Sequence, residues 1–212
     1  MDDNLPPARK IVHTEYVVPL LRLACVCRRW RYLIVGASTL WSSLFVDVDR
    51  EAALDNVSQL FHTRAAHAPL KVTLIVRQRA HVLELLPEWV AKLRSFQLKV
   101  VGLFPGHYST LFPSGAPLLE CLAISYRMDI PNDPRWRVDI SNCIFGDGVT
   151  PLRALAIVPV QFDFPSDSFP HLTHLYLSLK TTNMQAYDLT GDVLKLLSRT
   201  PQLQYLHISS VP

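Results

Sequence analysis

Metal or thiol chemistry in this chain would depend on a small number of cysteines. The four cysteines are Cys25, Cys27, Cys121 and Cys143. A Cys-x-Cys pair on one helix places its two sulfur atoms about 200° apart around the helix axis, so Cys25 and Cys27 are not expected to share a metal ion. The sequence has no C-x-x-C or H-E-x-x-H motif, and these are the spacings that supply metal ligands. We therefore expect no metal site.

Phosphate-binding and nucleophile motifs are also missing. The patterns G-x-x-x-x-G-K-[ST], G-x-G-x-x-G and G-x-S-x-G do not occur, and the whole chain has 7 glycines. A phosphate cradle needs such glycines because the backbone must approach the ligand closely. We therefore predict a non-catalytic protein without a cofactor. The alternative is an enzyme whose site lies in insertions, which would require a pocket of titratable groups with shifted pKa values.

Composition indicates a folded chain. Of the 212 residues, 49% are hydrophobic and 18% are charged, whereas disordered chains are polar and highly charged. The net charge of +3 is spread along the sequence, so it predicts neither a nucleic acid nor a membrane as partner. The acidic start Met1–Asn4 does not resemble a signal peptide, and no apolar stretch reaches the roughly 20 residues that span a bilayer. These features predict a cytoplasmic or nuclear protein.

One amphipathic helix is predicted from Pro19 to Gly36. Pro19 suits a first helical turn, apolar residues then recur at helical spacing, and Gly36 offers a C-terminal stop. Residues 38–41 follow as a turn or short helical fragment, and residues 44–48 alternate like a strand. A second helix is expected over residues 49–64.

Six short segments resemble one another along the rest of the chain. Three of them fit the pattern P-x-L-x-x-L-x-[LI] residue for residue, one is a residue shorter, one lacks the proline, and one is a weaker match. Leucine-rich repeats run about 20–29 residues, so the longer intervals, from Leu119 to Leu152 and from Leu172 to Leu203, require insertions. The six segments are residues 70–74, 93–98, 117–124, 151–157, 170–177 and 201–208, and their first leucines are Leu70, Leu93, Leu119, Leu152, Leu172 and Leu203.

Each segment predicts one short strand of a parallel sheet. Alternate residues of such a strand face inward, and the leucine and isoleucine positions of one repeat would stack on those of the next. The outward residues would line one concave face, whose mixture of polar and aromatic side chains is typical of protein recognition. The alternative is an ordinary solvated sheet face. The predicted partner-binding residues are Glu120, Arg153, His174, Tyr176, Tyr205 and His207.

Three histidines occur in the last two segments. We expect His171, His174 and His207 to be surface residues and not metal ligands. Of these three, His174 and His207 are expected to point outward from matching positions of neighbouring repeats. A helix over residues 191–199 is expected between the two segments, with Val193, Leu194 and Leu197 packed inward.

The N-terminal region carries a family resemblance. Residues 19–31 read Pro-Leu-Leu-Arg-Leu-Ala-Cys-Val-Cys-Arg-Arg-Trp-Arg, and residues 40–44 read Leu-Trp-Ser-Ser-Leu. Together they resemble the second half of the F-box in fungal F-box-like proteins, which read V-C-R-x-W-R and then L-W-S-x-L. Repeats of the form A-P-x-L-x-x-L-x-L commonly follow in that family, and the segment that begins at Ala116 looks like one of them.

The resemblance implies the substrate-recognition subunit of a Skp–cullin–F-box ubiquitin ligase. A Skp-type adaptor would bind the helical unit, and the repeats would bind a protein substrate. From their hydrophobic character alone, Trp30 and Trp41 are expected to pack in the core, with direct contact to a partner as the alternative. The residues assigned to adaptor binding or to the F-box core are Leu20, Val26, Cys27, Trp30, Leu33, Leu40 and Trp41.

The opening of the chain differs from the family pattern. An F-box typically begins L-P-x-E and continues into an apolar helix that ends in Ile-Phe, whereas Leu5-Pro6-Pro7 here lacks both the acidic residue and the phenylalanine. The alternative is a repeat module that does not bind the adaptor. The predicted fold is α/β, with a degenerate F-box-like helical segment over residues 1–50 and an irregular leucine-rich-repeat solenoid over residues 51–212. No polar capping repeat follows the last segment, so we expect an exposed apolar end.

Overall fold

The structure is a computed structural model, and it describes residues 14–48, 63–77, 87–101, 112, 115–127, 151–160, 169–180 and 189–211. Its elements, in chain order, are α1 (Thr14–Ala24), α2 (Arg28–Gly36), the 3₁₀ helix η1 (Ser38–Trp41), β1 (Ser43–Val48), β2 (Leu70–Arg77), α4 (Pro87–Val90), β3 (Leu93–Val101), β4 (Cys121–Arg127), β5 (Ala154–Val160), β6 (His174–Lys180), α5 (Leu189–Ser198) and β7 (Tyr205–Val211).

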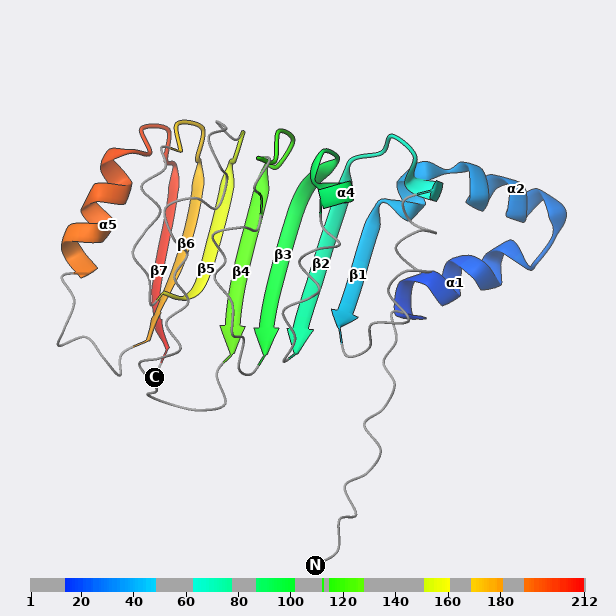
Figure 1. Ribbon diagram of the computed structural model, residues 1–212, viewed down its shortest axis with the longest axis horizontal. Helices are drawn as coiled ribbons and strands as arrows, with labels where there is room; N and C mark the ends of the chain where they lie inside the picture. Colours follow the sequence, from blue (N-terminus) through cyan, green and yellow to red (C-terminus); the bar gives the residue numbers. More distant parts are fainter. Residues whose placement is uncertain are drawn as a thin grey trace, which may run out of the picture.

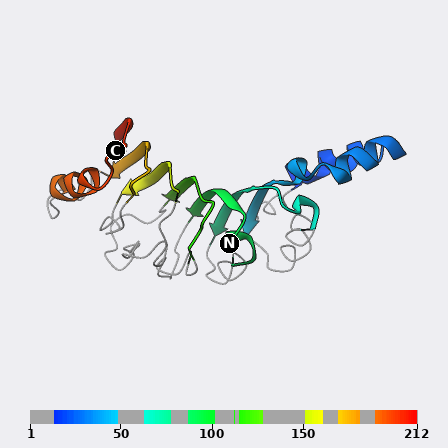
Figure 2. The same cartoon turned by 90° about the horizontal axis from the view of Figure 1, so that it is seen from above.

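The seven strands form one sheet in which all neighbours are parallel. Their order across the sheet is their order in the sequence, from β1 to β7. In Figure 1, α1 and α2 lie beyond β1, and α5 lies beside β7. Seen from above in Figure 2, the strands follow an arc. The predicted mixed α/β fold with a parallel sheet is confirmed, and each of the six similar segments contributes a strand.

Strand pairing follows the spacing of the repeated segments. From β3 to β7, each strand starts with the same offset from the next that separates the first leucines of their segments, and β5 and β6 keep this offset as far as Ile157, before a register shift at Val160. The step from β2 to β3 differs, because Val72 pairs with Phe96, whereas the leucine spacing predicts Ser95 as its partner. The register shifts just after Leu70. This irregularity absorbs the extra residue and keeps the apolar positions on one face.

Two rows of apolar side chains cross the buried face of the sheet. Side chains alternate between the two faces of a strand, so positions two residues apart along each strand build two parallel rows, and both belong to one hydrophobic core. The first row is Leu44, Val72, Phe96, Leu122, Leu155 and Leu175, and the second is Leu74, Leu98, Ile124, Ile157 and Leu177.

The two rows continue onto β7, where they become accessible to solvent. Leu206 pairs with Leu175 and Ile208 pairs with Leu177. Leu206 and Ile208 are 43% and 46% exposed, whereas their partners on β6 are fully buried. An exposed apolar end was expected at this position, and it lies at the outer strand of the described sheet.

Tight turns explain the prolines of the repeated segments. In the turns at Pro117, Pro170 and Pro201, the carbonyl oxygen of the residue before the proline accepts a hydrogen bond from the N–H of the leucine two residues after it. Proline suits the second position of such a turn because its ring fixes φ at the value required there and no N–H is needed. The strands begin two residues after these leucines, which is later than predicted. The N···O distances are 3.1 Å for Leu119 and Ala116, 3.2 Å for Leu172 and Phe169, and 3.1 Å for Leu203 and Thr200.

The predicted single helix from Pro19 to Gly36 is wrong, because two helices occupy this region. α1 begins at Thr14, so Pro19 lies inside it, and α2 begins at Arg28. The N–H of Val26 bonds to the carbonyl of Leu23, and Cys27 has extended backbone angles (φ −159°, ψ 171°). Apolar spacing could not reveal this break, because a short turn leaves the residues on either side at intervals that still fit a helix.

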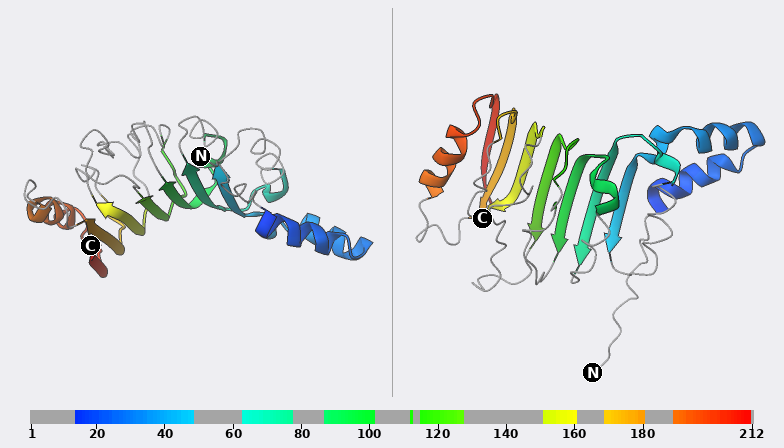
Figure 3. Two further views of the ribbon diagram at one scale, coloured as in Figure 1. Left: turned by 90° about the horizontal axis from the view of Figure 1, so that it is seen from below. Right: turned by 45° about the horizontal axis from the view of Figure 1, so that its top comes forward.

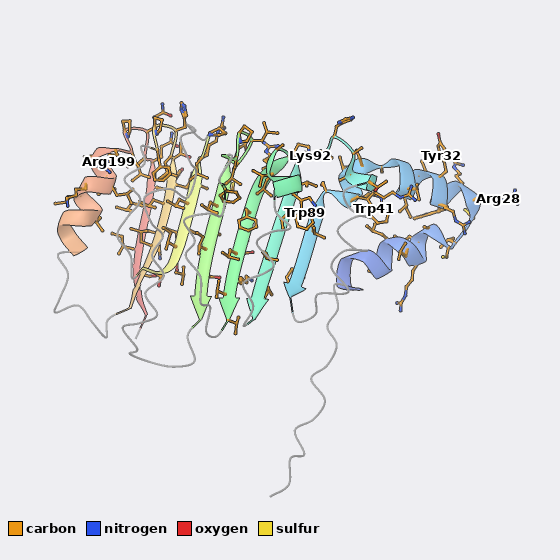
Figure 4. All side chains as sticks on the ribbon, in the orientation of Figure 1. Arg28, Tyr32, Trp41, Trp89, Lys92 and Arg199 are labelled. Atoms are coloured by element: carbon orange, nitrogen blue, oxygen red, sulfur yellow. The ribbon has the colours of Figure 1, made fainter. Side chains whose placement is uncertain are left out.

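The helix pair is fixed to the sheet through Trp41. This side chain is 1% exposed, and its Nε1–H donates a hydrogen bond to the carbonyl oxygen of Ile34 at 2.8 Å. In Figure 4, Trp41 lies where η1 meets the sheet, while Tyr32 and Arg28 lie at the far end of the pair. The Arg31 Nε–H bonds to the Ala24 carbonyl oxygen at 3.2 Å and ties α2 to the end of α1. Core packing of Trp41 is confirmed.

The helix over residues 191–199 is confirmed as α5, but its inward face differs from the prediction. Val193 and Leu197 pack against the core, as expected, and Leu196 is buried. Leu194 is 60% exposed, so its predicted inward position is wrong. Because an α-helix turns by about 100° per residue, Leu194 lies about 200° around the helix from Leu196. The helix buries the stripe that includes Leu196 and leaves Leu194 on the opposite side.

Two sequence features fall largely or wholly outside the described residues. The helix predicted over residues 49–64 is described only from residue 63, where residues 63–65 form a helical turn. The departure from the F-box pattern at Leu5-Pro6-Pro7 also lies outside the described part of the chain. Residues 38–41 and 44–48 are described, and they form η1 and β1 as predicted.

Candidate functional site

A groove of about 740 Å³ lies on the open face of the sheet, across β3 to β7. The open face is the one opposite the two buried apolar rows. It is built from the alternate strand positions, which form two register rows of their own. The first outward row contains Ser95, Cys121, Ala154, His174 and Tyr205, and the second contains Gln97, Ala123, Ala156, Tyr176 and His207.

The side chains at the centre of the groove are short. Both outward positions of β4 and β5 carry small residues: Cys121 and Ala123 on β4, and Ala154 and Ala156 on β5. Because these side chains end at or near Cβ, the two strands leave open volume above the sheet. At the neighbouring register positions, β3 carries Gln97 beside Ala123, and β6 carries His174 and Tyr176 beside Ala154 and Ala156. The groove is therefore a slot two strands wide.

Two stacked ring pairs form one wall of the slot. His174 on β6 stacks on Tyr205 of β7, with ring centroids 4.5 Å apart and an angle of 20° between the planes. Tyr176 stacks on His207 at 4.8 Å and 6°. Each pair consists of direct register partners. The spacing matches the separation of neighbouring strands, about 4.8 Å, so the sheet itself aligns the rings.

Hydrogen bonds hold the inner rings of these pairs in place. The Thr173 hydroxyl donates to the Arg153 carbonyl oxygen at 3.0 Å and lies 2.8 Å from His174 Nδ1. The tautomer of the His174 ring decides which of Nδ1 and Thr173 Oγ1 is the donor in this contact. The Tyr176 hydroxyl lies 3.3 Å from Ser209 Oγ.

The edge of the groove carries mainly basic side chains. Lys71 and Lys99 occupy outward positions of β2 and β3, and the exposed Arg153 directly precedes β5. Arg94 Nε donates to Glu120 Oε2 at 2.9 Å. This hydrogen bond, and then the charge of Glu120, raise the pKa of the Arg94 guanidinium.

Replacing Glu120 with glutamine is expected to leave the melting temperature within about 2 °C of the wild type, because exposed ion pairs contribute little to stability. The Arg94 side chain is largely open to water. Because the pKa of Arg94 is raised, its contribution to stability is present at every pH below the ordinary arginine pKa and is lost only at higher pH. The difference in melting temperature between Glu120→Gln and the wild type should therefore stay constant from about pH 5 to pH 9, and a large drop for Glu120→Gln would show that the pair is structural.

Some of the predicted partner-binding residues line the groove, and others do not. His174, Tyr176, Tyr205 and His207 all line the groove, whereas Glu120 and Arg153 lie one residue before their strands. The expectation that His174 and His207 lie at matching positions is wrong. His174 pairs with Tyr205, and His207 pairs with Tyr176. Counting from each proline would have revealed this offset.

Sequence reasoning missed the opposite wall of the groove. Ser95 and Gln97 of β3 face the slot, and the Thr73 hydroxyl lies 3.4 Å from Gln97 Oε1. The segment at residues 93–98 lacks the proline, so its outward positions were not included. The register rule that predicts Ala123 and Ala156 also selects Gln97. Applying it to this segment would have found the wall.

The residues assigned to the F-box unit differ in how deeply they are buried. Leu20 packs partly against the core and Trp41 is buried within it. Val26, Cys27, Leu33 and Leu40 are exposed. Trp30 is 46% exposed, so the expected core packing of Trp30 is wrong. Its position beside the break between the helices, and not within one continuous stripe, explains the difference.

Metal-binding groups and membrane spans were sought in the described residues. Within them, no group of three or more His, Cys, Asp or Glu side chains could hold a metal ion, and the exposed Cys25 and Cys27 lie in the turn between α1 and α2. None of the described helices is long and apolar enough to cross a bilayer. Comparison with protein-family models, with curated proteins and with solved structures finds no match to this chain.

Proposed function

We propose that this chain is a non-catalytic protein-binding adaptor, the substrate-recognition subunit of a Skp–cullin–F-box ubiquitin ligase. In this proposal, the α1–α2 pair is the second half of an F-box, and it binds a Skp-type adaptor. The strands belong to an irregular leucine-rich-repeat solenoid whose open face binds a protein substrate. The compartment would be the cytosol or the nucleus, where such ligases act.

The observation that carries the proposal is the apolar surface of the helix pair. Large apolar side chains there are open to solvent, although the same helices bury Ala24 and Ile34 in the core. Exposed apolar side chains that cluster on one element indicate an interaction surface. Figure 3 shows the pair extending away from the sheet. The exposed residues are Leu21, Leu23, Val26, Trp30, Tyr32, Leu33 and Leu40.

The repeated segments support the second half of the proposal. Each contributes one parallel strand, and each strand pairs only with its neighbours in the sequence. Such an arrangement produces a long open face without closing the sheet. Along that face lies a groove lined by tyrosine and histidine side chains, and aromatic residues are common anchors of protein interfaces.

Replacing Trp30 with alanine is expected to weaken binding of a purified Skp-type adaptor by about 30-fold or more, because truncating an interface tryptophan commonly costs about 2 kcal/mol or more. The melting temperature should change little, since Trp30 is already half open to water. Isothermal titration calorimetry would measure the affinity, and circular dichroism the melting temperature.

Tyr205→Ala is the matched control for the adaptor experiment. It removes an exposed aromatic side chain at the other end of the sheet, so adaptor affinity should not change. The alternative is a repeat module that does not bind the adaptor, and the lack of the L-P-x-E opening favours it. Failure of the wild-type chain to bind the adaptor would leave only that alternative.

A further inference from the structure

We propose that the groove on the open face binds an extended acidic peptide segment through one aromatic side chain. This inference rests on the proposed protein-binding function and specifies the class of substrate. The aromatic ring would lie above Ala154 and Ala156, against the inner faces of His174 and Tyr176. Carboxylates on either side of it would lie near the basic edge of the groove.

The first argument is the space between the walls. Ser95 and Gln97 on β3 stand opposite His174 and Tyr176 on β6, and only small residues lie between them. Three strand intervals of about 4.8 Å separate β3 from β6, so the slot is roughly 14 Å wide between strand axes. That width accommodates one aromatic side chain together with an extended backbone.

The second argument is the incomplete stacking of the rings. His174 and Tyr176 each have one ring face covered, by Tyr205 and His207 respectively. Their register partners on the other side are Ala154 and Ala156, whose methyl groups are too short to cover the second face. Aromatic rings favour offset stacking with a further ring. A third ring above β5 would continue one of the two stacks at the spacing of the strands.

The third argument is charge. The groove lining contains no Asp, Glu, Lys or Arg side chain, but Lys71, Lys99 and Arg153 lie around it. Within the described residues, no carboxylate forms an ion pair with these three, and the one acidic side chain nearby, Glu120, is paired with Arg94. The edge therefore has an excess of positive charge. An acidic segment complements it, and a basic one would be repelled.

Peptide binding to the full chain tests this inference directly. Fluorescein-labelled peptides with the cores Asp-Asp-Phe-Asp-Asp, Asp-Asp-Ala-Asp-Asp and Lys-Lys-Phe-Lys-Lys are compared by fluorescence anisotropy. The first should bind at least about tenfold more tightly than the second, the effect of burying and stacking one ring. The third should not bind, and affinity for the first should fall as salt rises. Equal binding of all three would overturn the proposal.

Variants locate the binding in the slot. Ala156→Leu fills the space above β5 and should weaken binding of the phenylalanine peptide by about tenfold or more. Ala91→Leu makes the same substitution at an exposed position outside the groove lining, and it should have no effect. Arg153→Glu should weaken binding, whereas Arg29→Glu on α2 should not. Unchanged affinity for Ala156→Leu in a protein that melts normally would overturn the inference.

Two further outcomes separate this inference from the proposed function. A chain that binds a Skp-type adaptor but does not distinguish the peptides would refute the inference and leave the adaptor role standing. A chain that selects the acidic phenylalanine peptide without binding the adaptor would support the inference and remove the ligase role.

A nucleic acid is the competing ligand for this groove. A thymidine oligonucleotide that displaces the peptide, and whose own binding is lost in Ala156→Leu, would show a nucleic-acid groove and overturn the inference.

Discussion

Trp41→Ala is expected to lower the free energy of unfolding by about 3–5 kcal/mol, the usual cost of truncating a buried tryptophan. The indole is buried where η1 meets the sheet, and its Nε1–H satisfies the Ile34 carbonyl at the end of α2. The substitution removes the packing and also leaves that carbonyl without its donor. Urea denaturation followed by circular dichroism would measure the change.

Two controls separate these contributions. Trp41→Phe keeps most of the ring but removes the hydrogen bond, so its cost should be smaller, about 1–3 kcal/mol. Trp30→Ala truncates the same residue type at an exposed position, and it should cost less than about 1 kcal/mol. Equal losses for Trp30→Ala and Trp41→Ala would contradict the assignment of Trp41 as the anchor of the helix pair.

Leu98→Ala is expected to cost about 2–5 kcal/mol of stability. Leu98 is fully buried in the middle of the second apolar row, between Leu74 of β2 and Ile124 of β4. Its truncation opens a cavity beside Leu74 and Ile124. Chemical denaturation of the variant and the wild type under identical conditions gives the difference.

Ile208→Ala is the matched control for the core substitution. Ile208 belongs to the same row but is 46% exposed on β7, so its truncation should cost less than about 1 kcal/mol. The ratio of the two losses tests the burial of the two positions. Similar losses would contradict the burial of Leu98 and the exposure of Ile208.

Much of the sheet could be predicted from the sequence because the repeated pattern reports two physical constraints at once. Leucine and isoleucine at alternate positions predict one buried face, and the proline that precedes the first leucine of the pattern predicts the turn. The pattern did not place the first strand residue, because the leucine that closes the turn is buried as deeply as those of the strand. Leu119 and Leu172 show this.

The helices were predicted less well, for two reasons. A short break does not disturb apolar spacing, so the turn at Cys25–Cys27 was invisible and Trp30 was assigned to the core. In α5, the choice between Leu194 and Leu196 as the inward residue depends on how the helix is rotated against the sheet. Sequence spacing allows both choices, and only the packing selects Leu196.

The candidate groove could be predicted in part. The pattern identified His174, Tyr176, Tyr205 and His207 as outward residues, and all four line the groove. The stacking of unlike rings could not be predicted, because it depends on register between β6 and β7 at the level of single residues. The slot itself arises because Ala154 and Ala156 occupy outward positions with short side chains, which leave the space above β5 open.

The sequential order of the strands has a consequence for how the chain assembles. Each strand finds its partner after a short stretch of chain, and the entropy of closing a loop rises slowly with its length. Any adjoining pair can therefore nucleate, after which the remaining strands add one at a time in either direction. Lengthening a connection between two strands should slow only the local step, so this architecture tolerates inserted segments of very different size between its repeats.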